Sequence, residues 1–465
     1  MSLTRQQIGM VAVLLSGAFI VVLNQTLLTP ALPTIMHHLN VSATTVQWLT
    51  SGYSLVEAVI IPLNAFLLGR LSTRRLFIGG LGLFTAGSVL CASAPTFTVL
   101  LLGRVCQATA TGALMPTVFA VILRIFPKEQ RGSAMGFIGL IVSFAPAIGP
   151  SLSGALVDTI GWRALFALVV CLTLVVLFAS VFSLKNFEGF EPTSFDGPSV
   201  GLLATGMVSL LYGLSTFTSS ARPLVSCALM VAGAVLLGAF VWRQRRLDNP
   251  VLRVQVLSHR EFRTATVVIM LLEAILIGSS VLMPMFIQDA SGQTATMSGL
   301  LMLPGAAIGA FCGLAAGRLF DRFGIRGIAL VGVLVLLVGV AGYFRFSADT
   351  PAWAVCLNYT VACCGLQFLI TPMNTWGFNS LPNSEIAHGN AIVSTVEQVG
   401  SSFGTAFVVS LTALSPLAVP PTASAAEQAS AGCHFGFMGL LALALAITLA
   451  IVFFVRDGRR ERQTA

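Results

Sequence analysis

The sequence predicts an all-α polytopic membrane protein with fourteen transmembrane helices, and three observations lead to this prediction. Hydrophobic residues make up 56% of the 465 residues and charged residues only 9%, far below the roughly 25% of soluble domains. Apolar runs of about 20 residues, enough to cross a bilayer, recur along the whole chain. Basic residues cluster between alternate pairs of these runs. These patterns exclude a water-soluble fold.

The apolar runs follow a 6+2+6 plan. A first group of six spans is expected near residues 8–30, 45–69, 76–95, 98–122, 133–157 and 162–183. Two spans that look inserted follow near 198–217 and 222–242. A last group is expected near 264–287, 294–316, 326–344, 352–375, 386–413 and 434–455. The chain therefore divides into an N-terminal six-helix half (1–184), a linker with two inserted helices and a basic connector (185–263), and a C-terminal six-helix half (264–465).

An internal repeat supports two related halves. The segment GRLSTRR begins at Gly69 and GRLFDRFGIR begins at Gly317, and each closes one span and opens the next. They end the second and tenth spans, eight apart, as six helices plus two inserted ones require. Repeated halves that rock around a central cavity are the physical basis of alternating access, although a fold alone does not establish transport.

The net charge of +8 indicates the orientation of the chain in the membrane rather than nucleic-acid binding. The basic residues of one set of loops are Arg70, Arg74, Arg75, Arg124, Lys128, Arg131, Arg318, Arg322 and Arg326. The opposite loops hold little beyond Arg163, Arg222 and Arg345. Positive loops face the cytoplasm, so both termini are expected there, in a bacterial cytoplasmic (inner) membrane. The first apolar run lacks a signal-peptide cleavage site and is expected to be retained.

No enzyme or cofactor chemistry is indicated. The nine cysteines show neither a CxxC nor a Cys/His spacing suited to a metal, so they are expected to act as small packing residues. The chain has no GxxxxGK[ST] phosphate loop, which argues against ATP hydrolysis. The lipid bilayer is an expected partner, and the chain is expected to act as a monomer.

Three motifs occur in the order LLLGRVCQATATGA, SFAPAIGPSLSGAL and GRLFDRFGIR. They resemble the fourth-helix, fifth-helix antiporter and cytoplasmic-loop signatures of the major facilitator superfamily, specifically its fourteen-helix drug:proton antiporter branch. The matching positions are Arg104, Gln107 and Gly112, then Gly149, Pro150 and Gly154, then Gly317, Asp321, Arg322, Gly324 and Arg326. The resemblance covers almost the whole chain. It implies export of lipophilic or cationic molecules by proton antiport, driven by the proton gradient without a cofactor.

The sequence departs from this branch in its N-terminal half. Asn24 stands where members usually carry an acidic residue in the first helix. The first loop, GRLSTRRLF, lacks the acidic part of the loop signature. Asn24 can form hydrogen bonds but cannot titrate, which moves any coupling role elsewhere.

Three carboxylates inside expected spans are candidates for proton coupling: Glu57, Glu273 and Glu397. Ionisable groups are costly in the bilayer, so those retained are functional candidates by default. Glu273 lies on the helix that repeats the first one, and first-helix equivalents line the cavity in the family it resembles. Gly400 and Gly404 beside Glu397 permit close helix approach. The alternative is a protonated Glu bonded to a neighbouring helix.

The resemblance implies that Arg104 has a role in proton transfer or in orienting the first helix. Because an arginine keeps its charge, it cannot itself carry the proton, but it can depress the pKa of a partner carboxylate. A purely structural role is the alternative. In the fifth span, Pro146, Gly149, Pro150 and Gly154 predict a kinked helix in tight contact with its pseudo-symmetric partner. In the family it resembles, this contact limits leakage and marks exporters.

Asp321, Arg322, Arg326 and Gly317 form the expected gate at the end of the tenth span. An Asp there can pair with an Arg or with a helix N-terminus in one conformation and release it in the other. A solvated loop that only fixes topology is the alternative. The expected substrate contacts are Asn358, Gln367 and Asn374 in the twelfth span. Two rival functions remain: a specific metabolite transporter with altered or no proton coupling, and a non-transporting membrane sensor.

Overall fold

The computed structural model describes residues 5–28, 31–41, 43–46, 48–127, 130–185, 196–217, 223–247, 250–293, 295–347, 350–420 and 424–455. Every element in these ranges is helical. The first are α1 (Arg5–Leu28), α2 (Leu32–Leu39), α3 (Ala43–Val46), α4 (Trp48–Ile60), η2 (Ile61–Leu63), α5 (Asn64–Arg70), α6 (Thr73–Ala92), α7 (Phe97–Ile125), α8 (Arg131–Thr159) and α9 (Arg163–Ser183). Then come α10 (Gly197–Thr216), α11 (Pro223–Gln244) and η4 (Val254–Ser258). The last are α12 (Arg260–Met285), η5 (Phe286–Ala290), α13 (Ala295–Phe323), α14 (Ile325–Gly342), η6 (Tyr343–Arg345), α15 (Ala352–Asn379), η7 (Asn383–Glu385), α16 (Ile386–Thr412), η8 (Ser415–Leu417) and α17 (Ala425–Phe454).

Within the described residues, twelve helices are long and apolar enough to cross a membrane. The other two expected spans, 45–69 and 133–157, coincide with the α4–η2–α5 segment and with α8. The first of these is broken by a 3₁₀ turn that contains Pro62, because proline cannot donate the backbone hydrogen bond that an α-helix needs. The chain is a multi-pass helical membrane protein.

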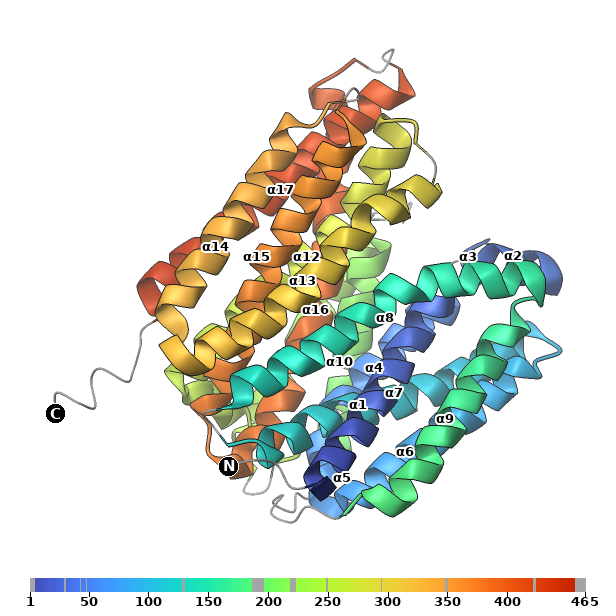
Figure 1. The fold of residues 1–465 in the computed structure, drawn as a ribbon, viewed down its shortest axis with the longest axis vertical. Helices are drawn as coiled ribbons and strands as arrows, with labels where there is room; N and C mark the ends of the chain where they lie inside the picture. The colour runs from blue at the N-terminus through green and yellow to red at the C-terminus, as the bar shows by residue number, and fades with distance from the viewer. Residues whose placement is uncertain are drawn as a thin grey trace.

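The helices form two groups with a hairpin beside them (Figure 1). In the N-terminal group (α1–α9), α6 packs on α7 and α9, and α1 packs on α8 and α9. In the C-terminal group (α12–α17), α15 packs on α13 and α14, and α12 packs on α16. The inserted hairpin consists of α10 and α11, which pack on each other. Figure 1 shows the two groups close together near the N-terminus and diverging away from it.

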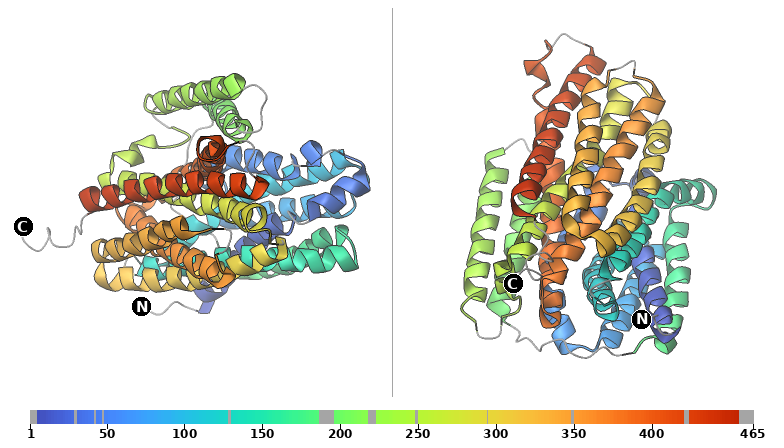
Figure 2. Two further views of the ribbon diagram at one scale, coloured as in Figure 1. Left: turned by 90° about the horizontal axis from the view of Figure 1, so that it is seen from above. Right: turned by 60° about the vertical axis from the view of Figure 1, so that its left-hand side comes forward.

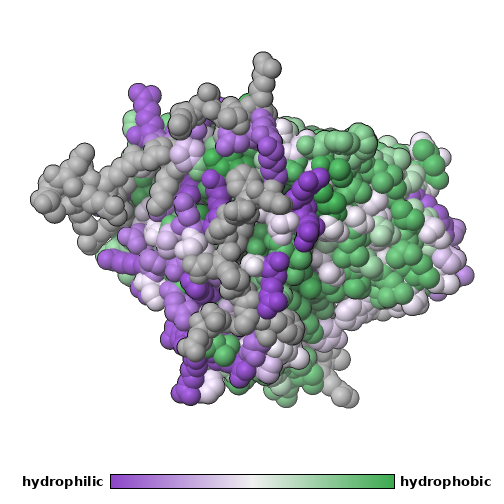
Figure 3. Space-filling model, turned by 90° about the horizontal axis from the view of Figure 1, so that it is seen from below, coloured by the Kyte–Doolittle hydropathy of each residue, from purple (hydrophilic) through white to green (hydrophobic). Residues whose placement is uncertain are grey.

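The end where the groups meet is here named the basic end, since α5, α7 and α13 finish there with Arg70, Arg124 and Arg322 in their last turns. Figure 3 shows hydrophilic side chains gathered over part of the lower face and a mostly hydrophobic surface beside them. Large apolar side chains such as Phe182 and Leu224 are 75% and 83% exposed, which is the surface that lipid covers.

Local signals explain where several helices begin and bend. The hydroxyl of Ser72 accepts a hydrogen bond from the Arg75 backbone N–H and starts α6. A capping box formed by Ser424 and Glu427 starts α17 nine residues before the expected span at 434. Pro284 precedes a π-helical turn at Phe286–Ala290, consistent with the hydrogen bond that proline removes. The short helices α2 and α3 were not expected.

Candidate functional site

Arg104 is the centre of a buried polar cluster in the N-terminal group. Its side chain on α7 is 1% exposed. Its Nε donates to the Leu49 carbonyl oxygen at 3.1 Å, and its Nη1 donates to Gln107 Oε1 at 2.8 Å. Its guanidinium carbon lies 4.1 Å from the centre of the Tyr53 ring. The charge is thus held by α4 and α7 through hydrogen bonds and an aromatic face.

Asn24 joins this cluster through an amide bridge. Its Nδ2 donates to Gln107 Oε1 at 3.3 Å, and Gln107 Nε2 donates to Ser88 Oγ at 2.8 Å. Gln107 therefore links α1, α6 and α7 to the arginine. In this cluster the first helix is held by neutral amides.

Glu57 supplies the carboxylate of this cluster. Its side chain on α4 is 6% exposed and accepts a hydrogen bond from Gln25 Nε2 at 3.0 Å. It also lies within electrostatic range of Arg104. The sequence reasoning did not select Gln25 or Tyr53, although Tyr53 lies one helical turn before Glu57 and so shares its face.

Glu273 and Glu397 lie together in the C-terminal group. They are on α12 and α16, are both partly exposed, and are close enough to interact electrostatically. A Cβ placed on Gly400 would lie 3.3 Å from Glu273 Cβ, so glycine lets the two helices approach here. The structure thus pairs two acids from helices that are far apart in sequence.

Asp321 bridges the two groups at the basic end. Its Oδ1 accepts from the Gly132 backbone N–H at 2.9 Å. Its Oδ2 accepts from the backbone N–H and the hydroxyl of Ser133, at 2.9 and 2.7 Å. Asp321 therefore caps the N-terminus of α8, where the helix dipole favours a negative charge. The backbones of Gly132 and Gly317 touch, leaving no room for a Cβ at either position.

Further hydrogen bonds cross between the groups at the same end. Arg131 donates to the side-chain oxygens of Asn379 and Asn383, and Arg124 donates to the Asn383 carbonyl oxygen at 2.8 Å. Asn390 Nδ2 on α16 donates to the Pro116 carbonyl oxygen on α7 at 2.9 Å. Of the other expected gate residues, Arg322 and Arg326 are exposed, and Arg322 lies over the Phe323 ring.

The fifth-span motif lies in α8, which runs unbroken as a helix from Arg131 to Thr159. Gly149 contacts Thr26 of α1, and the Ser153 hydroxyl donates to the Leu27 carbonyl oxygen at 2.6 Å. The surroundings of Pro146, Pro150 and Gly154 lie outside the described part. Among the described residues, α8 packs chiefly on α13 and α1 and also on α15, α9 and α7. The expected contact with its pseudo-symmetric partner stays a prediction.

The expected substrate residues on α15 have different surroundings. Asn358 donates to the Ala354 carbonyl oxygen of its own helix at 3.3 Å and packs against Gly342 of α14. Gln367 is half-buried beside Gly313 of α13. Asn374 is 7% exposed. Among the described residues, no group of three or more His, Cys, Asp or Glu side chains could hold a metal ion.

The fold is a bundle of membrane-length helices in two groups, with a buried polar cluster in one group and two acids within electrostatic range in the other. The chain belongs to the Major Facilitator Superfamily, whose family model matches residues 14–405. Members of this family carry small-molecule substrates across membranes.

Relatives and solved structures agree with this assignment. The chain is 40% identical over 406 residues to the uncharacterized MFS-type transporter YcnB of Bacillus subtilis (strain 168), covering 86% of this chain and 85% of the relative. It is 30% identical to the lincomycin resistance protein LmrB of Listeria monocytogenes, covering 97% of each. It is 32% identical to a multidrug resistance protein B homolog of Mycobacterium tuberculosis, covering 78% of this chain and 68% of the relative.

Two solved structures share the fold at 13% identity. The human organic anion transporter MFSD10 (TETRAN) aligns with a TM-score of 0.68 over 96% of this chain and 100% of its own. The proton:xylose symporter XylE aligns with a TM-score of 0.62 over 96% and 94%.

Proposed function

We propose that the protein exports lipophilic or cationic small molecules by proton antiport, through alternating access of two six-helix halves. The observation that carries this proposal is the pairing of Glu273 with Glu397. Two partly exposed carboxyls within electrostatic range of each other can take up a proton or attract a cationic substrate, and each event disfavours the other because like charges repel. Relatives named for lincomycin and multidrug resistance support the same substrate class.

In this proposal the chain has fourteen spans. The α4–η2–α5 segment and α8 join the twelve apolar helices, and α8 with its 29 residues would extend about 43 Å, more than the roughly 30 Å of a bilayer core. The halves comprise residues 1–184 and 264–465, with 185–263 inserted between them. The basic end faces the cytoplasm of a bacterial inner membrane with both termini, so the contacts of Asp321 close the inner side.

Transport in proteoliposomes with an imposed pH gradient tests this function, with ethidium as the probe. The wild type is expected to export ethidium in exchange for protons that move down the imposed gradient. Glu273→Gln and Glu397→Gln are each expected to lower this export about tenfold and to flatten its dependence on pH, because each removes a titrating group. Glu261→Gln, at the exposed first turn of α12, is the matched control and keeps the wild-type profile.

The results also separate the alternatives. If both carboxylate variants respond to pH as steeply as the wild type, the assignment of the proton site is wrong. A metabolite transporter without proton coupling is favoured by the neutral Asn24–Gln107 bridge beside Arg104. That alternative predicts transport that survives collapse of the gradient. If the protein is instead a non-transporting membrane sensor, no dye of a test panel is expected to be transported.

A further inference from the structure

The inserted hairpin lies where the two groups meet. Its inner helix α10 contacts α4 of the N-terminal group and α16 of the C-terminal group. Leu203, Met207 and Leu211 on α10 are buried, whereas Leu224 and Val235 on α11 are 83% and 65% exposed. Figure 2 shows the hairpin standing at the side of the bundle. It therefore covers one side of the line between the groups and presents α11 to lipid.

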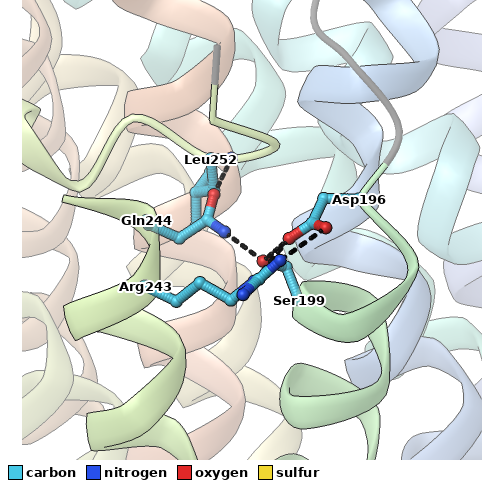
Figure 4. A network of polar contacts seen from close by, with 5 residues as sticks. All are labelled: Asp196, Ser199, Arg243, Gln244 and Leu252. Carbon is cyan, nitrogen blue, oxygen red and sulfur yellow. Dashed lines mark hydrogen bonds and ion pairs between the residues drawn. The ribbon is translucent and has the colours of Figure 1, made fainter. Parts of the chain in front are cut away.

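A polar network fixes the base of the hairpin (Figure 4). Arg243 Nε and Nη2 donate to the two oxygens of Asp196 at 2.7 and 2.9 Å. Ser199 bonds to the same carboxylate and accepts from Gln244 Nε2 at 2.6 Å. A bidentate pair of this kind fixes direction as well as distance. The network, named the hairpin latch, joins the start of α10 to the end of α11.

The hairpin latch continues into the C-terminal group through the connector. Gln244 Oε1 accepts from the Leu252 backbone N–H at 3.0 Å, and the Arg253 N–H donates to Nδ1 of the buried His388 on α16 at 3.3 Å. Val254 and Val256 of the connector are buried, and η4 packs on α12 and α16. These directional hydrogen bonds hold the hairpin, the connector and α16 in one geometry.

The contact with the N-terminal group is of another kind. Tyr212 of α10 stacks on Trp48 of α4, with ring centres 6.1 Å apart and planes within 18° of parallel. Stacked rings attract by dispersion and have no fixed donor or acceptor, so they can shift past each other at small cost. The hairpin is thus held to the C-terminal group by directional hydrogen bonds and contacts the N-terminal group through stacked rings.

We propose that the inserted hairpin is a lateral wall that moves as one body with the C-terminal group and slides on α4. The proposal rests on the alternating access of the proposed function. In it, Asp196, Arg243, Gln244 and His388 are positioning residues that keep α10 against α16 while the groups rock. Lipid is then kept out of this side of the carrier in both states.

Spin-label distances test the movement without requiring transport. Labels are placed pairwise at the exposed positions Val235 on α11, Val338 on α14 and Val175 on α9, in a variant without the nine native cysteines. When pH or ethidium concentration changes, the 235–338 distance is expected to stay constant, whereas 235–175 and 338–175 shift together. A 235–338 distance that shifts while 235–175 stays constant overturns the proposal. If 338–175 never shifts, alternating access itself fails.

Reversible cross-linking tests the consequence for export. In the same background, Trp48→Cys with Tyr212→Cys joins the hairpin to α4, and Thr216→Cys with Ser226→Cys joins α10 to α11 within the hairpin, where the two hydroxyls are in contact. A short bifunctional thiosulfonate across 48–212 is expected to lower ethidium export at least about tenfold, with recovery on reduction. Across 216–226 it is expected to leave export within about twofold, because it joins two parts of one moving body. Full export with 48–212 joined, or equal loss with 216–226 joined, contradicts the proposal.

Discussion

The polar clusters of the two helix groups are built from opposite chemistry. The N-terminal cluster surrounds a buried Arg104 with amides, a carbonyl and an aromatic ring, and its one acid, Glu57, is bonded to Gln25. The C-terminal cluster brings Glu273 and Glu397 together, both partly exposed. A fixed charge that is saturated by neighbours holds helices in place, whereas paired acids respond to protons and cations. On the proposed function, the N-terminal cluster would support the helices and the C-terminal pair would carry the exchange.

The largest expected effect comes from removing the fixed charge. Arg104→Met removes the hydrogen bonds that the guanidinium donates to the Leu49 carbonyl oxygen and to Gln107 Oε1, so Gln107 Oε1 keeps only its longer bond from Asn24 Nδ2. Each lost bond from a charged donor costs about 1.5–3 kcal/mol. Export of ethidium is expected to fall on the order of 100-fold at every pH, with a lower melting temperature.

Arg104→Lys is the matched variant for that test. It keeps the charge but loses the planar fork that reaches two acceptors, so an intermediate loss of about tenfold is expected. If Arg104→Met instead changes the pH at half-maximal export and leaves the maximum rate intact, the N-terminal cluster takes part in exchange, and the comparison breaks down.

The loops at the basic end sharpen the comparison, because Asp321 has no acidic counterpart in the loop from Arg70 to Thr73. Asp321→Asn removes the charge that caps α8 and places an amide nitrogen against backbone N–H groups. The open form of the basic end is expected to gain about tenfold in population. The distance between labels at Val175 and Val338 measures this shift. Glu261→Gln, which also removes one negative charge, at the exposed first turn of α12, is the control and is expected to leave the distribution unchanged. An equal shift in both variants would assign the effect to loss of negative charge in general.

The smallest effect is expected at the hairpin latch. The Arg243 guanidinium, with the Ser199 hydroxyl, holds the pKa of Asp196 at about 2, below its ordinary value of 3.8. A lowered pKa in the folded protein means that the stabilisation is complete above the ordinary value and is lost as the pH falls through about 2. The distance between labels at Val235 and Val338 is therefore expected to be the same at pH 8 and pH 5. A broader distribution of the Val235–Val338 distance at pH 5 than at pH 8 would show that another titrating group controls the position of the hairpin.

Sequence reasoning located the helices and the ionisable residues inside them, because apolar length and the rarity of buried charge are both visible in one dimension. It selected Glu57, Glu273, Glu397, Arg104 and Asp321. It did not identify their neighbours, such as Gln25, Asn379 and Asn383. Which polar side chain meets which depends on the rotation and crossing of helices far apart in sequence, which a single sequence does not specify. Asn358 illustrates the same limit, since its amide bonds to its own helix.

The touching backbones of Gly132 and Gly317 have a consequence for electrical insulation. A carrier that exchanges a substrate for protons must not contain a continuous chain of water molecules across the membrane. Protons would cross along such a chain faster than the carrier turns over. With no side chain between the two glycines, nothing there can rotate aside and admit water. In the closed form of the basic end, the barrier at this point is therefore set by backbone geometry rather than by a movable side chain.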